Sequence, residues 1–210
     1  VAIADICYDC RSPYLIESKS LKLYFNSLNN EKFNNIAEIE ALVTRDLQTY
    51  LESAVTVCIT ALADRRQHTL SPGFSGICLD DLPATCSVYQ VEPAYLAVEA
   101  EDVEETLYSD LLKSNCLVTG QPDWGSIQIS YKGKRISHEG LLKYLVSYRE
   151  HHEFHEQCIE RIFMDIFTRC KPTSLTVYGR YTRRGGLDIN PYRSTEAIAF
   201  SALPQRLIRQ

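Results

Sequence analysis

The feature that most constrains this chain is an internal repeat. The segment Leu21-Lys-Leu-Tyr-Phe-Asn-Ser-Leu28 can be laid on Leu141-Leu-Lys-Tyr-Leu-Val-Ser-Tyr148, and one residue later Phe33-Asn-Asn35 falls on Phe154-His-Glu156. Two such segments, far apart in sequence, favour two copies of one structural module. The chain has 210 residues, which is enough for two modules of about 100 residues each. We therefore predict one module over residues 1–105 and a second over residues 106–210.

Hydrophobic periodicity predicts a similar order of elements in each half. Alternating apolar residues indicate strands, and apolar stripes at helical spacing indicate helices. The predicted strands cover residues 1–9, 54–62, 89–98, 125–131 and 175–181, and the predicted helices cover residues 21–28, 36–51, 141–148 and 154–170. Each half thus combines strands with a pair of helices, which predicts an α+β fold. The chain starts at Val1, without a methionine and inside a predicted strand, so we expect some N-terminal residues of the first module to be missing.

Charge and hydropathy argue against two classes of protein. The net charge is −5, which does not favour a protein that mainly grips nucleic acid or an anionic membrane. No stretch approaches the roughly 18 consecutive apolar residues of a membrane span. We expect a soluble, cytoplasmic protein that makes no direct contact with nucleic acid or membrane.

The eight cysteines are spread from Cys7 to Cys170 and are not clustered as in a small disulfide scaffold. We therefore expect most of them to be free thiols. Cys7 and Cys10 have CxxC spacing, but no second pair at zinc-site spacing accompanies them. We do not predict a metal or redox site there.

Cys116 and Asp123 form a candidate nucleophile and proton donor. A turn over residues 120–122 separates them and can bring both side chains to one cavity. The polar neighbours Asn115, Thr119 and Gln121 favour a loop at the mouth of a sheet, where catalytic groups concentrate. The alternative is that Cys116 is a small buried apolar residue, as most structural cysteines are.

The two predicted modules differ at chemically important positions. The first has Glu17-Ser-Lys19 where the second has Ser137-His-Glu139, and the second has His155-Glu156 where the first has Asn34-Asn35. One composite site could therefore take its helix-start residues from the first module, and Cys116 and the His-Glu pair from the second. Divergence of two surface segments by drift is the alternative.

Four motifs together resemble a known family. They are Glu17-Ser-Lys-Ser-Leu-Lys-Leu-Tyr24, the segment from Cys116 to Asp123, Phe154-His-Glu-Gln-Cys158 and Tyr181-Thr-Arg-Arg-Gly-Gly-Leu-Asp-Ile-Asn-Pro191. The resemblance is to the NADPH-dependent 7-cyano-7-deazaguanine reductases, the QueF nitrile reductases of queuosine biosynthesis and tRNA modification, in their long two-module form. It implies tandem tunnelling-fold (T-fold) modules, each an antiparallel sheet with two helices on one face. T-fold modules assemble into barrels, so we expect a homodimer or a higher homo-oligomer.

The resemblance also implies a mechanism. The Cys116 thiolate would add to the nitrile of 7-cyano-7-deazaguanine to form a covalent thioimide, and Asp123 would protonate the nitrogen. Two NADPH molecules, used as co-substrates, would then deliver two hydrides and yield 7-aminomethyl-7-deazaguanine. Asp123 must hold a proton near neutral pH, so we expect it to be buried or to lie near another anion.

The binding residues follow from the same resemblance. Glu156 would accept hydrogen bonds from the guanine-like edge of the base. His155 would lie beside it, with Ile16, Glu17 and Ser18 on the other side of the pocket. Without the resemblance, His155-Glu156 would be read as a solvated histidine and a carboxylate that caps a helix.

NADPH phosphates would lie against two pairs, Ser18-Lys19 and Arg184-Gly185, to which Lys22 and Arg183 could add charge. The alternative for Arg183-Arg-Gly-Gly186 is a solvated turn. The chain has no Gly-x-Gly-x-x-Gly after a strand, so a Rossmann site is not predicted.

Two other classes of function remain open. One is a zinc-dependent hydrolase of the same fold, like a GTP cyclohydrolase, in which Cys116 and His155 would bind zinc with a third ligand such as His151 or His152. The other is a non-catalytic purine- or pterin-binding protein. The reductase requires no metal, and none is expected.

Overall fold

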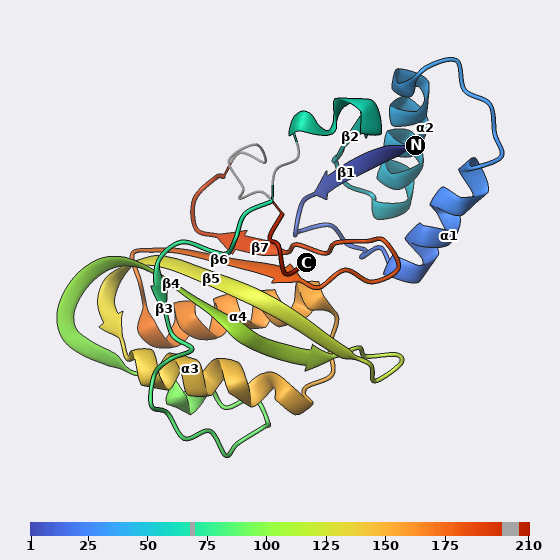
Figure 1. Ribbon diagram of the computed structural model, residues 1–210. Helices are drawn as coiled ribbons and strands as arrows, with labels where there is room; N and C mark the ends of the chain where they lie inside the picture. Colours follow the sequence, from blue (N-terminus) through green and yellow to red (C-terminus); the bar gives the residue numbers. More distant parts are fainter. Residues whose placement is uncertain (68–69, 199–205) are drawn as a thin grey trace. The chain divides into compact units, whose positions relative to one another are not determined.

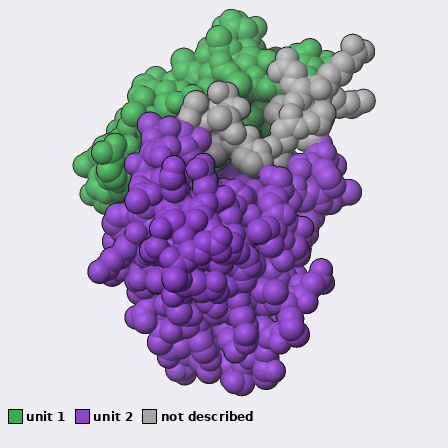
Figure 2. Space-filling model, turned by 90° about the vertical axis from the view of Figure 1, so that its left-hand side faces the viewer, with its two compact units in different colours: residues 1–69 green, residues 70–210 purple. Residues whose placement is uncertain are grey.

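The computed structural model describes residues 1–67, 70–198 and 206–210. The chain divides into two compact units, residues 1–69 and 70–210 (Figures 1 and 2). This boundary differs from the one predicted at residue 105. The reason is the long strand β4 (Val98–Asn115), which runs across the predicted boundary and pairs with β5 (Pro122–Ile136) from Val98↔Ile136 to Asn115↔Pro122.

Unit 1 contains an antiparallel strand pair and two helices. β1 (Ala2–Tyr8) pairs with β2 (Val55–Ala61), and α1 (Ser18–Leu28) and α2 (Ile36–Leu51) lie between these strands in sequence. Its fully buried core comes mainly from α2, which contributes Val43, Leu47 and Leu51. A 3-10 helix (Leu62–Gln67) follows β2.

Unit 2 is a sheet with both of its α-helices on one face (Figure 1). The strand order is β3-β4-β5-β6-β7, where β3 is Ile77–Cys78, β6 is Ser174–Tyr181 and β7 is Tyr192–Ser194. Every neighbouring pair is antiparallel except β3 and β4, which are parallel. The helices are α3 (His138–Val146) and α4 (His155–Cys170), with 3-10 helices at Pro93–Tyr95 and Ser147–Glu150. The α+β class, with antiparallel strands and a helix pair on one face, is confirmed.

Alternation along the strands builds the core of unit 2. Ile127, Ile129 and Tyr131 alternate along β5 and are 0 to 3% exposed, as are Leu175 and Val177 on β6. These side chains share one hydrophobic cluster with the buried residues of α3 and α4. Burial of such side chains is worth about 1.5 to 3 kcal/mol each, so this cluster fixes the sheet against the helices.

The sequence repeat is also a repeat of contacts. The Tyr24 hydroxyl donates to Asp46 at 2.9 Å in unit 1, and the Tyr144 hydroxyl donates to Asp165 at 2.6 Å in unit 2. In both units a serine three residues after the tyrosine donates to its carbonyl oxygen at 2.6 Å. The second helix of each pair is 16 residues long. In both units, a hydrogen bond from a tyrosine on the first helix to an aspartate on the second therefore joins the two helices.

One strand prediction is wrong, and one long strand was missed. The strand predicted over residues 89–98 does not form, because Pro93 starts a 3-10 helix whose Ala94 N–H donates to the Glu92 side chain at 3.0 Å, and only its last residue, Val98, lies in a strand, as the start of β4. β4 was missed because its first residues are charged and exposed on both faces, so they lack the alternation that marks a strand.

Each of the eight cysteines lies within the described residues and is a free thiol, as predicted. Burial, followed by the charge of Asp9, raises the pKa of Cys7. Burial also raises the pKa of Cys158 to about 12, so this thiol is protonated near neutral pH. Among the described helices, none is both long enough and apolar enough to cross a membrane.

Candidate active site

Cys116 lies in the tight connection between the two longest strands. β4 ends at Asn115 and β5 begins at Pro122. The Cys116 N–H donates to the Gln121 carbonyl at 2.8 Å, and the Gly120 N–H donates to the Cys116 carbonyl at 2.9 Å. Gly120 has a φ of 67°, a conformation that glycine adopts at little cost. The turn therefore fixes Cys116 at the end of a rigid strand pair.

The Cys116 thiol is half-buried and surrounded by donors. Burial alone raises its pKa, but hydrogen bonds from the Thr119 side chain, the Thr119 and Val118 N–H groups and Arg184 outweigh burial and lower the pKa. Donors directed at a sulfur atom stabilise the thiolate, which is the reactive form. The pKa of Cys116 is thus lowered, whereas that of Cys158 on α4 is raised.

Asp123 is buried, with an exposed fraction of 2%. Its Oδ1 accepts a hydrogen bond from Arg184 Nη1 at 2.7 Å, and His155 Nε2 lies 3.5 Å from the same oxygen. The other arm of the Arg184 guanidinium donates to the Gln121 side chain at 2.5 Å. Burial, one of the two environments expected for Asp123, is present. The expected neighbouring anion is not among its described contacts, which are a guanidinium, of opposite charge, and an imidazole.

A tight turn directs Arg184 towards Asp123. Arg184 and Leu187 exchange backbone hydrogen bonds of 3.0 and 3.1 Å, and Gly185 and Gly186 between them have φ angles of 58° and 86°. A two-residue turn with both central φ angles positive is the type that most favours glycine. Arg183-Arg-Gly-Gly186 is therefore a turn, but Arg184 is engaged with Asp123 and Gln121 and is not simply solvated.

His155 and Glu156 begin helix α4. His155 is only 6% exposed, and its ring packs edge-on against Tyr181 with the centroids 4.1 Å apart. Burial raises the pKa of Glu156, and its own N–H, His155 and Arg193 offset only part of that effect. His155 is therefore not the solvated histidine of the alternative interpretation, and Glu156 is a partly buried carboxyl group with a raised pKa at a helix start.

The remaining predicted residues belong to unit 1. Ile16 packs against the core of that unit. Glu17 caps α1, because its carboxylate accepts from the Lys19 N–H at 2.9 Å and the Ser20 N–H at 2.7 Å. Ser18 is the first residue of α1, and the Lys19 side chain is exposed. Unit 2 brings Cys116, Asp123, His155 and Arg184 together, and the approach of the α1 start to them remains a prediction.

A different group has metal-ligand spacing among the described residues. One ligand atom each of His151, Glu153 and Cys158 lies within 4.8 Å of the others. This group includes neither Cys116 nor His155. Arg161 already neutralises Glu153, with Nη2 2.5 Å from one carboxylate oxygen and Nε 3.1 Å from the other. His151, which the hydrolase alternative offered as a third zinc ligand, belongs to this group.

Comparison with known proteins decides the family. Residues 1–59 match the profile described as "Nitrile reductase, 7-cyano-7-deazaguanine-reductase N-term", and residues 122–199 match "QueF-like protein". A NADPH-dependent 7-cyano-7-deazaguanine reductase of Legionella pneumophila (strain Corby) is 62% identical over 210 residues, covering 100% of this chain and 74% of the relative. The chain belongs to this reductase family.

A second curated relative agrees with this assignment. The enzyme of the same name from Dechloromonas aromatica (strain RCB) is 55% identical over 196 residues, 93% of this chain and 69% of the relative. An archaeosine synthase QueF-Like in the apo form has a TM-score of 0.41 and 16% identity, over 48% of this chain and 99% of that one. Members of the reductase family are oxidoreductases.

The structure adds three contacts to the predicted site. Thr119 bonds the Cys116 thiol, Gln121 receives Arg184, and Tyr181 packs against His155. Each of these residues belongs to one of the four motifs: Thr119 and Gln121 lie within the Cys116–Asp123 segment, and Tyr181 begins the last motif. Their roles were missed because each depends on which side chain lies opposite after folding.

Proposed function

We propose that this protein reduces the nitrile of 7-cyano-7-deazaguanine to the aminomethyl group, with two molecules of NADPH as co-substrates. The names of its relatives support the reductase activity. The observation that carries the proposal is the activated Cys116 thiol, whose donor Arg184 also contacts the buried Asp123. We further propose that the reaction serves queuosine biosynthesis in the cytoplasm.

In the first step the Cys116 thiolate attacks the nitrile carbon. A sulfur–carbon bond forms, one carbon–nitrogen π bond breaks, and the nitrogen takes a proton from Asp123 to give a neutral thioimide. The donors around Cys116 lower its pKa and so favour the reactive thiolate. Two hydrides, each accompanied by a proton, then reduce the adduct to the amine and release the thiol.

Arg184 and His155 assist the proton donor in this proposal. Arg184 contacts both the thiol and Asp123, so in this proposal one cation stabilises the attacking thiolate and orients the carboxyl group that protonates the nitrogen. We assign to His155 the return of a proton to Asp123, because His155 Nε2 lies 3.5 Å from Asp123 Oδ1.

Glu156 recognises the base in this proposal. A guanine-like edge offers a ring N–H and an amino group, which together donate two hydrogen bonds to one carboxylate. Glu156 is desolvated at the start of α4, so two donors from a ligand would satisfy it. We propose that His155 lies beside the base and that Ile16, Glu17 and Ser18 close the other side.

We propose that Ser18 and Lys19 bind an NADPH phosphate at the start of α1. A helix N-terminus favours an anion, and an exposed lysine adds a full positive charge. Arg184 and Gly185 remain our second prediction for a phosphate contact, although the guanidinium bonds Asp123 and Gln121. Homo-oligomers that complete T-fold barrels are part of the same proposal.

The decisive experiment follows the mass of the protein with substrate and without NADPH. Addition to a nitrile expels nothing, so the protein should gain the full mass of the substrate, and peptide mapping should place it on Cys116. Cys116→Ala should abolish the adduct, Asp123→Asn should slow its formation, and NADPH should discharge it. An adduct on another cysteine, or none on the unmodified protein, contradicts the proposal.

The hydrolase and the binding protein predict different results. An enzyme that hydrolyses the nitrile would release ammonia. A zinc-dependent hydrolase would contain about one zinc ion per chain and would lose both the zinc and its activity on chelation. A binding protein holds the base without consuming NADPH. Oxidation of two NADPH per nitrile is the outcome that favours the reductase.

A further inference from the structure

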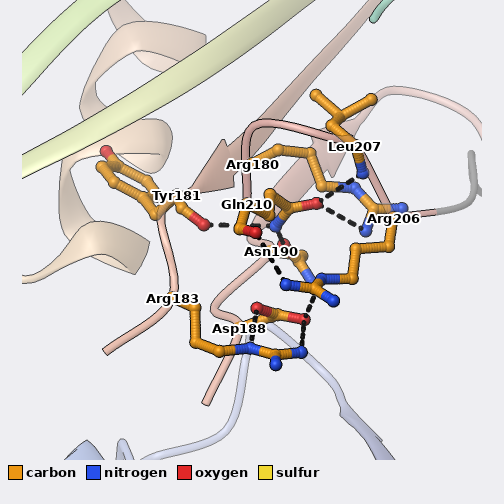
Figure 3. Close-up of polar contacts among 8 residues, drawn as sticks. All are labelled: Arg180, Tyr181, Arg183, Asp188, Asn190, Arg206, Leu207 and Gln210. Atoms are coloured by element: carbon orange, nitrogen blue, oxygen red, sulfur yellow. Dashed lines mark hydrogen bonds and ion pairs between the residues drawn. The ribbon is translucent and has the colours of Figure 1, made fainter. Parts of the chain in front are cut away.

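The last described residues of the chain, 206–210, lie against the loop that carries Arg184 (Figure 3). We call residues 182–191 the Arg184 loop. The Gln210 side-chain nitrogen donates to the Tyr181 carbonyl at 3.2 Å and to the Asn190 side-chain oxygen at 2.7 Å. Tyr181 and Asn190 stand at the two ends of the loop, so one amide group joins both of its arms.

Asp188 provides a second link between the loop and residues 206–210. Arg183 approaches one oxygen of Asp188 with its Nε at 3.1 Å, and Arg206 approaches the other oxygen with its Nε at 3.2 Å (Figure 3). The side chain of Asp188 is only 20% exposed, so solvent screens these ion pairs less than it screens pairs on an open surface. Asp188 thus connects the arm that precedes Arg184 to residues 206–210.

Residues 206–210 are themselves held firmly within unit 2. Ser71 donates to the Arg206 carbonyl at 2.8 Å and accepts from the Ile208 N–H at 2.8 Å. Leu207 is 1% exposed and packs in a cluster with buried Phe74 and Tyr178. Arg209 Nη1 donates to the Asp110 carbonyl at 2.5 Å and to the Gly125 carbonyl at 3.1 Å, which ties the segment to β4 and β5.

The tip of the Arg184 loop needs such support. Gly185 and Gly186 form its turn, and nothing lies within 4 Å of the position where a Cβ of Gly186 would stand. Glycine pairs lose much conformational freedom on folding. The exact direction of Arg184 therefore depends on contacts elsewhere in the loop.

We propose that residues 206–210 are a positioning clamp, in which Gln210 and Arg206 hold the Arg184 loop so that the guanidinium faces Asp123 and Cys116. Gln210, Arg206, Asp188 and Asn190 are positioning residues, since none of them bonds Cys116 or Asp123 in the described contacts. The clamp affects Cys116 and Asp123 only by holding Arg184 in place. Its importance for catalysis rests on the proposed function.

The test measures the reactivity of Cys116 directly and needs no substrate. Alkylation by iodoacetamide is followed across pH on the full chain, with peptide mapping to separate Cys116 from the other thiols. Gln210→Ala and Asp188→Asn should each alkylate Cys116 about twofold to threefold more slowly at neutral pH, with the profile displaced to higher pH. The reason is that a loosened Arg184 no longer stabilises the thiolate.

Two matched variants separate positioning from general weakening of the fold. Asp102→Asn makes the same chemical change as Asp188→Asn, but Asp102 pairs with Lys134 near the opposite end of β4. It should leave the alkylation profile unchanged. Asn190→Asp keeps an oxygen acceptor for Gln210 and should retain the normal profile, whereas Asn190→Leu should shift it.

Unchanged profiles in both Gln210→Ala and Asp188→Asn, or an equal shift in Asp102→Asn, would overturn the clamp. A lower unfolding temperature with an unchanged profile would show a purely structural role and would overturn it as well. The substrate adduct is scored separately. A shifted profile in a protein that forms no adduct supports the clamp and contradicts the proposed function.

Discussion

At the scale of single residues, the charge of Glu156 has opposite effects in our proposal: the ionised carboxylate binds the base, but it makes the fold less stable. Its carboxyl group is desolvated at the start of α4, and its pKa is raised from the ordinary value of 4.5. A carboxyl group whose pKa is raised on folding binds its proton more tightly in the folded state. It therefore stabilises the fold fully below about pH 4.5, and that stability is lost as the pH rises through the folded-state pKa.

We expect Glu156→Gln to preserve or increase stability at neutral pH while it weakens binding of the base. An amide carries no charge to desolvate, but it presents one donor group to an edge that only donates. Loss of a buried charged partner costs about 2 to 5 kcal/mol of binding energy. Thermal unfolding across pH and calorimetric titration with 7-cyano-7-deazaguanine measure the two effects.

The stability of Glu156→Gln should also lose the pH dependence described above. Glu160→Gln is the matched control, since Glu160 lies on the same helix and its side chain is 55% exposed. Unchanged base affinity in Glu156→Gln would remove Glu156 from the binding site.

At the scale of elements, β6 and α4 touch at Gly179. A Cβ built on Gly179 would lie 2.6 Å from Ile159 Cδ1 and 2.8 Å from its Cγ1. Ile159 is 0% exposed, and it follows His155 by one helical turn. The missing side chain of Gly179 therefore sets how closely the strand approaches the helix that carries His155 and Glu156.

We expect Gly179→Ala to destabilise unit 2 by about 1 to 3 kcal/mol, as extra volume in a packed core does. It should also slow adduct formation, because α4 must move and takes His155 with it. Gly73→Ala is the control, because nothing lies within 4 Å of its Cβ position. Denaturant unfolding measures the stability, and mass spectrometry of the adduct measures the rate of its formation. If Gly179→Ala were as stable as Gly73→Ala, α4 would be able to move away from β6 without loss of stability, which would contradict the prediction.

These elements also show what sequence can and cannot predict. The periodic stripe of α2 and the alternation of β1 were sufficient to place both elements closely. The sequence analysis grouped Cys116, Asp123 and His155 in one site; the structure places His155 beside Asp123 and gives Asp123 and the Cys116 thiol a common partner in Arg184, and their functional roles remain a prediction. The role of Gly179 was out of reach, because the contact with Ile159 depends on how β6 packs against α4. The pairing of Arg184 with Asp123 likewise depends on a turn that joins distant parts of the chain.

At the scale of the whole molecule, two units of similar construction differ in the residues at their helix starts. The Tyr24–Asp46 and Tyr144–Asp165 hydrogen bonds show that both helix pairs are joined alike. His155-Glu156 stands at the start of the second helix of unit 2 only, and Glu17-Ser-Lys19 stands at the start of the first helix of unit 1 only. Duplication followed by loss of complementary residues would give each unit one part of a shared task. In the proposed function, the base and the thiol belong to unit 2 and the NADPH phosphate to unit 1.

The division of tasks predicts that Lys19→Ala raises the apparent NADPH constant and leaves the covalent step intact. Loss of a charge-assisted contact costs about 1.5 to 3 kcal/mol, or roughly tenfold to a hundredfold in the constant. Steady-state kinetics with varied NADPH and the rate of adduct formation without NADPH measure the two steps separately.

Lys32→Ala is the control, because it removes the same charge from an exposed position between α1 and α2. It should change neither the NADPH constant nor the rate of adduct formation. Because screening weakens an exposed lysine–phosphate contact, the effect of Lys19→Ala should shrink as ionic strength rises. Equal losses in the hydride and adduct steps would mean that unit 1 takes part in forming the thioimide, and the division between the units would have to be abandoned.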